Sequence, residues 1–569
     1  MGLGRRSCFH IALALALLAA AAPALGLQVT KQLAAGVTLY QEIVTDTASP
    51  LVINAVTVDA ADASVSIRAA IGSDAIHTEH WAKGRETVSE LTARKNALLG
   101  VNADFFPFTG DPLGVCIADG ELISEPANNR VAFALLRSRG MFFDNPGMEA
   151  KLTLPSGVGR QIDGINRGRE TNQLVAYTRA FGASTRTTHK GTEVVLQSAD
   201  LPVRSGKTIE CTVAEVRVDA ANTPIPDGGM VLSAGGPAAW FLKENLKPGD
   251  TLSVRFEIRS ASGCDWNLVE QAVGGGPWLL KNGSEFIDFA DEGFGAAFSA
   301  LRHPRTALGI TSEGRLLIVT VDGRQTISGG VSLPELSRLM KRLGAVDAIN
   351  LDGGGSTTLA ARGMLINSPS GGEERPVANA LLVFAPEPAV EPLPGLSISG
   401  IDPEAISGRG TQLFLTWGDD AQMLTPDQLS GVVWGSTNGV GIVNQMGYFT
   451  PIKARKGTVN ALYGGRMVSR EVSVVAGPPA KLDLELTPDP KDASRSQAKG
   501  TVQDTNSNRV GGCEVTIAVT GGRAEPPSVI TGKNGEFAAA IVWDASAGER
   551  KVRAAAGDVS AEAGPAAKK

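Results

Sequence analysis

The chain has 569 residues, of which 43% are hydrophobic and 20% are charged, and its formal net charge is −6. This length exceeds what a single hydrophobic core usually supports, so we expect several domains. The mildly acidic balance shows no basic excess and argues against a nucleic-acid partner. The five cysteines are scattered without a Cys-x-x-Cys pair, which excludes a zinc motif and a dense disulfide framework.

The N-terminus has the pattern of a secretory signal. Arg5 and Arg6 precede the apolar run Phe9–Ala22, and the small residues up to Gly26 offer a cleavage site. The run is too short to cross a membrane comfortably. We therefore predict a signal peptide over residues 1–26 and a secreted, periplasmic or cell-surface protein with no transmembrane segment after signal cleavage. The alternative is an uncleaved membrane anchor.

Residues 27–385 are predicted to form an α+β catalytic domain with mixed sheets, in which residues 150–265 are a β-rich insertion. The best helix candidate is "SLPELSRLMKRLG". Ser332 is a plausible N-cap, Glu335 completes a capping box, and Pro334 sits in the first turn, where its missing N–H costs nothing. Gly344 ends the helix.

This helix lies between the strand candidates "RLLIVTVD" and "VDAINLD". Strand, helix and strand over about forty residues form a βαβ unit, so the two strands should be parallel. Each strand ends in an aspartate, Asp322 or Asp352, and both carboxylates should therefore lie at one edge of the sheet. The two could be within catalytic reach if the strands are adjacent. The alternative is that each Asp-Gly pair merely starts a turn.

Beyond residue 385 the composition changes. The stretch "PEPAVEPLPG" over residues 386–395 has the composition of a semi-rigid linker. Short alternating runs separated by turn residues then predict two all-β immunoglobulin-like sandwiches, over residues 396–477 and 478–569. Because few contacts should cross the linker, we expect residues 27–385 to fold alone.

A run of glycines follows Asp352, and such a run is costly unless the backbone must turn with positive φ or approach a partner closely. Its free N–H groups could form a nest for an anionic oxygen, with Ser356 and Thr357 adding hydroxyl groups. The alternative is a tight loop at the sheet edge. The loop "AVGGGPWLLKNG" has the same character, and "LLGVNADFFPFTG" places Asn102 and Asp104 at the end of another strand. Arg305 directly precedes a further strand and could bind a phosphate or carboxylate.

Several stretches together resemble the phosphodiester glycosidase family: "VNADFF", "GGGPWLL", "RTALGIT", "GRLLIVTVDGR", "GGVSLPELSRLMKRLGAVDAINLDGGGSTT" and "RPVANALLVF". The resemblance is dense over residues 270–385 and sparser over residues 35–270. It implies hydrolysis of a sugar-1-phosphodiester at the sugar side. The segment after the linker resembles the bacterial immunoglobulin-like group 2, and the last segment resembles the invasin-type group.

The site residues follow from the residue chemistry together with this resemblance. We expect Asp352, and secondarily Asp322, to face the anomeric carbon, and Arg305 to stabilise the departing phosphate. The expected substrate-binding residues are Asn102, Asp104, Gly275, Gly276, Thr306, Gly353, Gly354, Gly355, Ser356, Thr357 and Asn379. The clustered Asp and Asn oxygens could hold a hard cation such as Ca²⁺, but no loop has a specific spacing for it, so no cofactor or metal site is assigned.

Three classes of function remain open from the sequence. The first is an exported glycosidase acting on a phosphoglycan or cell-envelope polymer. The second is a phosphodiesterase that cuts the P–O bond. The third is a non-catalytic envelope or adhesion protein that binds phosphorylated glycans, which the tandem immunoglobulin-like tail favours. The tail domains could also contact a cell-envelope polymer.

Overall fold

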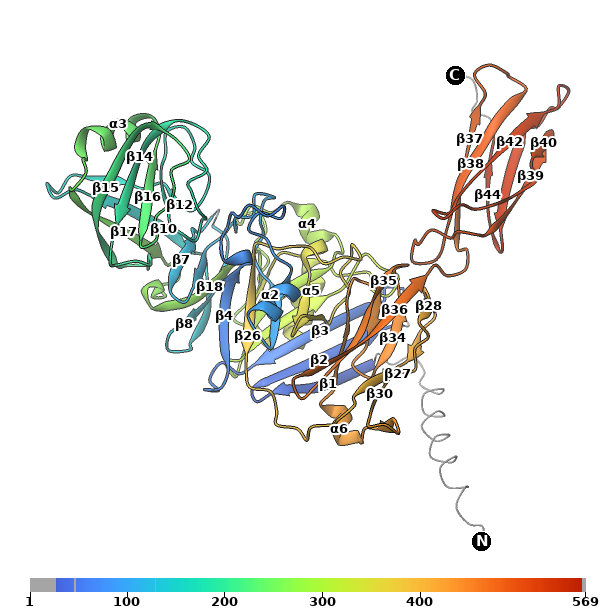
Figure 1. Cartoon of the computed structure of the whole chain (residues 1–569), viewed down its shortest axis with the longest axis horizontal. Helices are drawn as coiled ribbons and strands as arrows, with labels where there is room; N and C mark the ends of the chain where they lie inside the picture. The colour runs from blue at the N-terminus through green and yellow to red at the C-terminus, as the bar shows by residue number, and fades with distance from the viewer. Residues whose placement is uncertain (1–26, 46–47, 128, 565–569) are drawn as a thin grey trace, which may run out of the picture.

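The computed structural model describes residues 27–45, 48–127 and 129–564, and the predicted signal peptide lies outside them. Strands account for 46% of the chain and helices for 9%. Figure 1 shows three parts in a row, with a separate group of strands at one end, a central body, and the strands after residue 478 at the other end. Within the described residues, no helix combines the length and the apolar character needed to cross a membrane.

Two sheets form the central body. The strand order of the first sheet is β1 (Leu27–Ala34), β2 (Val37–Val44), β3 (Leu51–Val58), β22 (Leu316–Val321), β21 (Arg305–Thr311), β23 (Ala345–Asn350), β19 (Trp278–Lys281) and β20 (Ser284–Glu285). The order of the second sheet is β28 (Glu404–Ile406), β36 (Arg466–Val475), β35 (Lys456–Tyr463), β32 (Val433–Ser436), β25 (Met364–Leu365), β24 (Leu359–Ala361), β5 (Leu99–Asn102), β26 (Asn379–Phe384) and β4 (Ser66–Ile71).

The main hydrophobic core is shared by these two sheets. Side chains such as Leu39 and Ile318 from the first sheet and Val101 and Leu381 from the second belong to one buried cluster. Alternate residues of the first sheet belong to a second cluster with helix α5 (Leu333–Arg342), and helix α2 (Val88–Arg94) contributes to a third cluster with the second sheet. The order of layers is therefore helix, sheet, sheet and helix. Loops that follow strands of the two sheets can meet at the shared edge of the layers.

Helix α5 has the predicted N-terminus. The Ser332 side chain accepts a hydrogen bond from the backbone N–H of Glu335, and the Glu335 carboxylate accepts one from the N–H of Ser332, which is the predicted capping box. Its apolar face supplies Leu333, Leu336 and Met340 to the core beneath the first sheet. Burial of this face fixes the helix against the strands that precede and follow it.

The strands on either side of α5 are parallel to each other but are not neighbours. Strand β21 lies between β22 and β23 and pairs with both in antiparallel fashion. The aspartates that follow β22 and β23 therefore share an edge of the sheet, as predicted, but their strands are separated by about two strand spacings, roughly 10 Å. The first residues of β21 lie between them.

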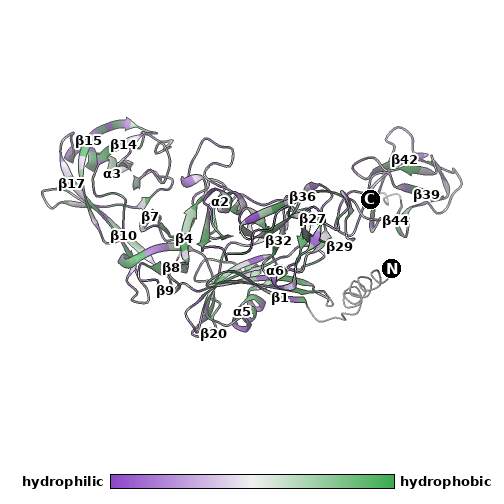
Figure 2. Ribbon diagram, turned by 60° about the horizontal axis from the view of Figure 1, so that its bottom comes forward, coloured by the Kyte–Doolittle hydropathy of each residue, from purple (hydrophilic) through white to green (hydrophobic). Residues whose placement is uncertain are grey.

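The predicted insertion forms its own sheet. Its strand order is β11 (Gly159–Gln161), β10 (Gly147–Thr153), β17 (Thr251–Arg259), β15 (Thr208–Ala220), β14 (Gly191–Gln197), β16 (Gly229–Ala234), β13 (Leu174–Tyr177) and β12 (Gly164–Ile165), and helix α3 (Gly236–Asn245) packs on it. Figure 2 shows hydrophobic and hydrophilic residues alternating along β15, as expected of a strand with one buried face. A five-stranded sheet links it to the body, with strand order β7 (Glu121–Ser124), β6 (Cys116–Ala118), β18 (Val269–Gly274), β8 (Ala132–Leu136) and β9 (Met141–Asp144).

The second sheet of the body continues across the predicted linker. Strand β32 pairs with β25 through Leu365 and Ser436, and Val433 and Leu462 belong to the main core. This differs from the separate cores expected from the sequence. The physical reason is that β25 would otherwise end the sheet with an open edge, which the strands of the tail extend and protect. The composition of residues 386–395 gives no sign of this pairing.

The remaining tail elements complete the chain. Short strands and one helix accompany the extended sheet: β27 (Ser397–Ser399), β29 (Thr411–Gln412), β30 (Phe414–Trp417), β31 (Gln422–Met423), α6 (Pro426–Ser430), β33 (Gly441–Val443) and β34 (Tyr448–Pro451). Two four-stranded sheets enclose the last core: β37 (Lys481–Pro488), β38 (Arg495–Gln503), β42 (Glu536–Trp543) and β40 (Gly522–Glu525), with β41 (Ser528–Ile530), β39 (Glu514–Thr520), β43 (Lys551–Ala556) and β44 (Val559–Ala563). Residues 478–564 thus form two packed sheets, while the immunoglobulin-like type of either tail segment stays a prediction.

Candidate active site

The glycine loop after β23 has a separate physical reason for each glycine. A side chain at Gly353 would place its Cβ 2.7 Å from the carbonyl oxygen of Pro304. Gly354 has a φ of +60°, which disfavours other residues. A Cβ at Gly355 would lie 2.3 Å from the guanidinium of Arg375, which covers this part of the loop. The close approach predicted from the sequence is therefore present.

Asn102 connects three chain segments at the edge of the two sheets. Its Nδ2 donates to the carbonyl oxygen of Asp352 over 2.7 Å. Its Oδ1 accepts from the hydroxyl of Thr306 over 2.8 Å and from the N–H of Thr358 over 3.1 Å. Asn102 and Thr306 are fully buried, so both position the glycine loop and neither side chain is exposed for substrate.

Asp352 is the sequence-predicted carboxylate that remains half-buried at the edge of the site. Burial raises its pKa to about 6, against the opposing effects of a hydrogen bond from Ser356 and of the positive charges of Arg375 and Arg130. Ser356 also accepts a hydrogen bond from Arg375 over 3.2 Å. Asp352 is therefore largely ionised at neutral pH and lies near two cations.

Asp104 lies close to Asp352 but is buried, with 1% of its surface exposed. Its carboxylate accepts hydrogen bonds from the N–H groups of Gly114, over 2.6 Å, and Phe105, over 2.7 Å. Burial raises its pKa to about 7, and the nearby charge of Asp352 contributes to the increase. The N–H of Asp104 donates to Oδ1 of the fully buried Asn379. Asp104 and Asn379 are thus buried residues that support the backbone beside Asp352.

Arg130 is the functional candidate that the sequence did not reveal. Its guanidinium lies 5.2 Å from the ring centre of Phe105 and 4.7 Å from that of Phe294. Its Nε and Nη1 atoms are buried without a hydrogen-bond partner. It is close enough to Asp104 and Asp352 to lower the pKa of both carboxyl groups. Such a cation, held in place by aromatic rings and lacking acceptors, is suited to an anionic ligand.

The only signal for Arg130 in the sequence is its position just before a strand. It directly precedes the buried run that leads into β8, and Arg305 is the first residue of β21. No motif distinguishes the two, because the difference lies in which side of a sheet each side chain faces. The phosphate contact was therefore predicted for Arg305, which lies within the stretch of strongest family resemblance.

The guanidinium of Arg305 is bonded to backbone carbonyl groups on the helix side of the first sheet. The exposed fraction of Arg305 is 1%, and its guanidinium lies 4.7 Å from the ring centre of Phe298. Nε donates to the carbonyl oxygen of Val331, and Nη2 donates to those of Phe298 and Leu301. The reason is the alternation of side chains along β21, because Thr306 faces the other sheet and Arg305 faces the helix side. This arrangement favours a structural role for Arg305 over the expected phosphate contact.

Asp322 is also buried, with no exposed surface. Its Oδ1 accepts from the side-chain amide of Asn367 and its Oδ2 from the N–H of Ser368, each over 2.9 Å. Asn367 in turn donates to the carbonyl oxygen of Thr357 over 3.0 Å. Burial raises the pKa of Asp322 to about 7. The structure therefore makes Asp322 an anchor for the chain that follows the glycine loop, without an open path to substrate.

The second glycine loop directs its N–H groups into the protein. The N–H of Gly275 donates to the carbonyl oxygen of Val131 over 3.0 Å, and that of Gly276 donates to Asn350 over 2.7 Å. Both glycines are buried. Thr357 is likewise buried, with 1% exposure. These residues support the site from within, and the N–H groups of Gly275 and Gly276 are used by the fold.

Two further features bear on the chemistry. Among the described residues, no group of three or more His, Cys, Asp or Glu side chains has an arrangement that could hold a metal ion. The four cysteines beyond the signal region, Cys116, Cys211, Cys264 and Cys513, are free thiols.

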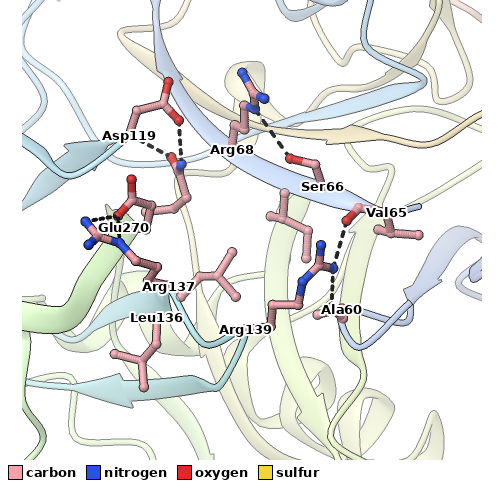
Figure 3. Close-up of a pocket in the computed structure, with 12 residues that line it drawn as sticks. Ala60, Val65, Ser66, Arg68, Asp119, Leu136, Arg137, Arg139 and Glu270 are labelled. Atoms are coloured by element: carbon pink, nitrogen blue, oxygen red, sulfur yellow. Dashed lines mark hydrogen bonds and ion pairs between the residues drawn. The ribbon is translucent and has the colours of Figure 1, made fainter. Parts of the chain in front are cut away.

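A cavity of about 260 Å³ lies elsewhere, between β4 and the five-stranded sheet (Figure 3). Figure 3 shows that its charged groups have partners within the protein. Arg139 donates to the carbonyl oxygens of Ala60 and Val65, and Arg137 forms an ion pair with Glu270 over 3.0 Å. The cavity shares no lining residue with the site described above, and its polar groups join neighbouring loops.

Comparison with known proteins agrees with the resemblance predicted from the sequence. Residues 203–384 match the family model of phosphodiester glycosidases, which confirms that prediction. The prophage-derived protein YomE of Bacillus subtilis is 36% identical over 116 residues, which are 20% of this chain and 17% of that protein. N-acetylglucosamine-1-phosphodiester α-N-acetylglucosaminidase of Mus musculus is 35% identical over 156 residues, which are 26% of this chain and 29% of that enzyme. The matches thus span less than a third of these relatives.

Solved structures show the same architecture over a longer stretch. A hypothetical protein from Synechocystis has a TM-score of 0.53 and 25% identity, with 64% of each chain covered. A protein of Burkholderia pseudomallei, whose name describes it as exported, has a TM-score of 0.50 and 25% identity, with 59% of this chain and 74% of that chain covered.

Proposed function

Because the chain carries a phosphodiester glycosidase domain, we propose that it hydrolyses a sugar-1-phosphodiester at the glycosyl C–O bond. The observation that supports this most directly is that a half-buried carboxylate, Asp352, lies near a guanidinium with two unpartnered nitrogen atoms, that of Arg130. A carboxylate suits the positive charge that develops on the sugar, and a guanidinium suits the negative charge that develops on the leaving phosphate.

In this mechanism Asp352 faces the anomeric carbon. A glycosyl C–O bond breaks through a state with oxocarbenium character, which a nearby carboxylate stabilises or attacks. With its pKa near 6, Asp352 is charged at neutral pH and can act as nucleophile, base or electrostatic stabiliser. The leaving group is a phosphate monoester, so the reaction has less need of a strong general acid than ordinary glycoside hydrolysis.

The departing phosphate is stabilised by arginines. Arg130 has two buried nitrogen atoms without partners, and Arg375 lies against Gly355 and donates to Ser356. We assign the phosphate contact to Arg130 and the support of the loop to Arg375. Asn102 and Asp322 act by positioning, because both are buried and bonded to the backbone of the loop or of the segment that follows it.

We further propose that the protein is exported and acts on a phosphoglycan or a cell-envelope polymer. The basis is the signal pattern before residue 27 and the two tail segments, whose immunoglobulin-like patterns are typical of modules that space or anchor a catalytic domain. The Burkholderia protein of similar fold is also named as exported.

The bond that is cleaved can be identified with ¹⁸O-labelled water and a panel of sugar-1-phosphodiesters. The proposal predicts label in the released sugar and none in the phosphate. Label in the phosphate would instead show a phosphodiesterase. If the folded protein turned over no member of a broad panel yet bound phosphorylated glycans, it would be a binding protein.

A further inference from the structure

Three arginines lie at or near the glycine loop that follows Asp352, and we refer to Arg85, Arg324 and Arg375 as the mouth arginines. Arg375 and Arg324 are exposed and lie against the glycine loop, with nitrogen atoms 2.3 and 3.2 Å from where Cβ atoms at Gly355 and Gly354 would be. Arg85 is half-buried, and its positive charge lies close enough to that of Arg375 for the two to interact.

Among the residues that the structure describes, the mouth arginines form no close ion pairs, although the charge of Arg375 is near enough to Asp352 to lower the pKa of that carboxyl group. Throughout the described ranges, none of them lies within 4.0 Å of a carboxylate oxygen, although many other arginines of the chain form such ion pairs. Arg85 donates to the carbonyl oxygen of Ala82, Arg375 donates to a hydroxyl, and Arg324 contacts the ring nitrogen of His303. Three positive charges with a single carboxylate near them, that of Asp352, favour an anionic ligand.

An exposed aromatic ring adjoins this charge. The guanidinium of Arg85 lies 5.6 Å from the ring centre of Phe108, and 79% of the surface of Phe108 is exposed. Phe106, on the same loop, is 5.9 Å from the same guanidinium. One face of an exposed ring can pack against a sugar, while the adjacent guanidinium binds a phosphate.

We propose that Arg85 and Arg375, with Phe108, form a second anion subsite that takes a further phosphate of a substrate with repeated sugar-phosphate units. This inference rests on the proposed function, because it extends the same substrate outward from Asp352. Arg130 would bind the phosphate of the scissile phosphodiester, and Arg85 and Arg375 would bind a second phosphate at a more exposed position. A substrate with a single phosphodiester and a neutral alcohol would leave this subsite empty.

The test uses two matched substrates of whichever sugar the enzyme accepts: the sugar-1-phosphodiester of glycerol, and the same compound with a second phosphate on the glycerol. The wild-type protein should have a kcat/KM at least about tenfold higher for the second, as expected of one added charge-assisted contact. This preference should shrink at high salt, because the mouth is exposed to solvent. Equal kcat/KM values for the two substrates would overturn the inference while leaving the proposed function intact.

Two variants locate the effect. Arg85→Gln should lose the preference and keep the wild-type kcat/KM for the single phosphodiester, and Phe108→Ala should weaken the preference in the same direction. Arg338→Gln, on the exposed side of α5, removes the same charge from the opposite face of the sheet and is the matched control. If Arg338→Gln reduced the preference as much as Arg85→Gln, general charge attraction would explain the effect and the subsite would be refuted.

A binding measurement separates this inference from catalysis. Calorimetric titration should show tighter binding of glycerol 1,3-bisphosphate than of glycerol 1-phosphate to the wild-type protein, and no such difference for Arg85→Gln. Equal binding of the two probes to the wild-type protein would refute the subsite even in an active enzyme. Absence of turnover of both substrates, with the difference in binding retained, would refute the glycosidase activity and leave the anion subsite.

Discussion

The same substitution at two arginines should have opposite consequences, and this contrast tests how the site is assigned. Arg130→Gln removes a guanidinium that has two buried nitrogen atoms without partners. Arg305→Gln removes one that donates to three backbone carbonyl oxygens beneath the first sheet. We expect the first variant to fold and lose activity, and the second to lose stability.

The magnitudes follow from these contacts. A hydrogen bond to a charged group contributes about 1.5–3 kcal/mol, so Arg130→Gln should reduce kcat/KM by about 10- to 150-fold. Its stability should change by no more than about 1 kcal/mol, because lost stacking on Phe105 and Phe294 is offset by removal of unsatisfied buried nitrogen atoms. At Arg305, the glutamine amide can replace only part of three hydrogen bonds, and each orphaned buried carbonyl costs about 1–3 kcal/mol. The total should be about 2–5 kcal/mol.

The assay is the melting temperature of each variant together with kcat/KM on a sugar-1-phosphodiester, measured below the melting transition. Arg338→Gln, an exposed change on α5, serves as the control for loss of one positive charge. The reasoning would be refuted if Arg305→Gln kept the wild-type melting temperature and lost activity while Arg130→Gln remained active. That result would show that Arg305, as predicted from the sequence, contacts the phosphate.

Three further predictions concern Asp352, Asp322 and the tail. Asp352→Asn should fold normally but lose at least about a thousandfold in kcat, roughly 4 kcal/mol of transition-state stabilisation, and turnover within tenfold of wild type would exclude a catalytic role. The activity of the wild-type protein should decrease as the pH is lowered past about 6, because this carboxylate becomes protonated. Because burial raises the pKa of Asp322 from 3.8 to about 7, its folded state is favoured at low pH and that advantage is lost as the pH rises through 7. The cost of Asp322→Asn in the free energy of unfolding should therefore shrink by an amount on the order of 4 kcal/mol between pH 4 and pH 8, which denaturant titrations would show. A fragment of residues 27–385 should melt below a fragment of residues 27–477, because it lacks Val433 and Leu462 from the main core; equal melting temperatures would show that the shared sheet adds little.

The sequence predicted local features better than their arrangement. Helix α5, its capping box and the parallel direction of the flanking strands could be predicted because capping and periodicity are properties of neighbouring residues. The insertion of β21 between β22 and β23 could not, because strand order depends on contacts between distant segments. The same limit explains the two arginines. Arg305 begins its strand and Arg130 lies just before β8, and only the packing shows how each guanidinium is used.

In the glycine loop after Asp352, part of the backbone that could form an anion nest is used by the fold. The N–H of Gly354 donates to the carbonyl oxygen of Pro304, and those of Gly275 and Gly276 on the second loop also bond within the protein. With these three donors used by the fold, side chains are the main groups available to balance the charge of a bound phosphodiester. The arginines that can do this lie at positions 85, 130, 324 and 375, far apart in the chain, so no short motif contains them. The glycines are needed for another reason: Gly353 lets the backbone pass Pro304, and Gly355 leaves room for the guanidinium of Arg375.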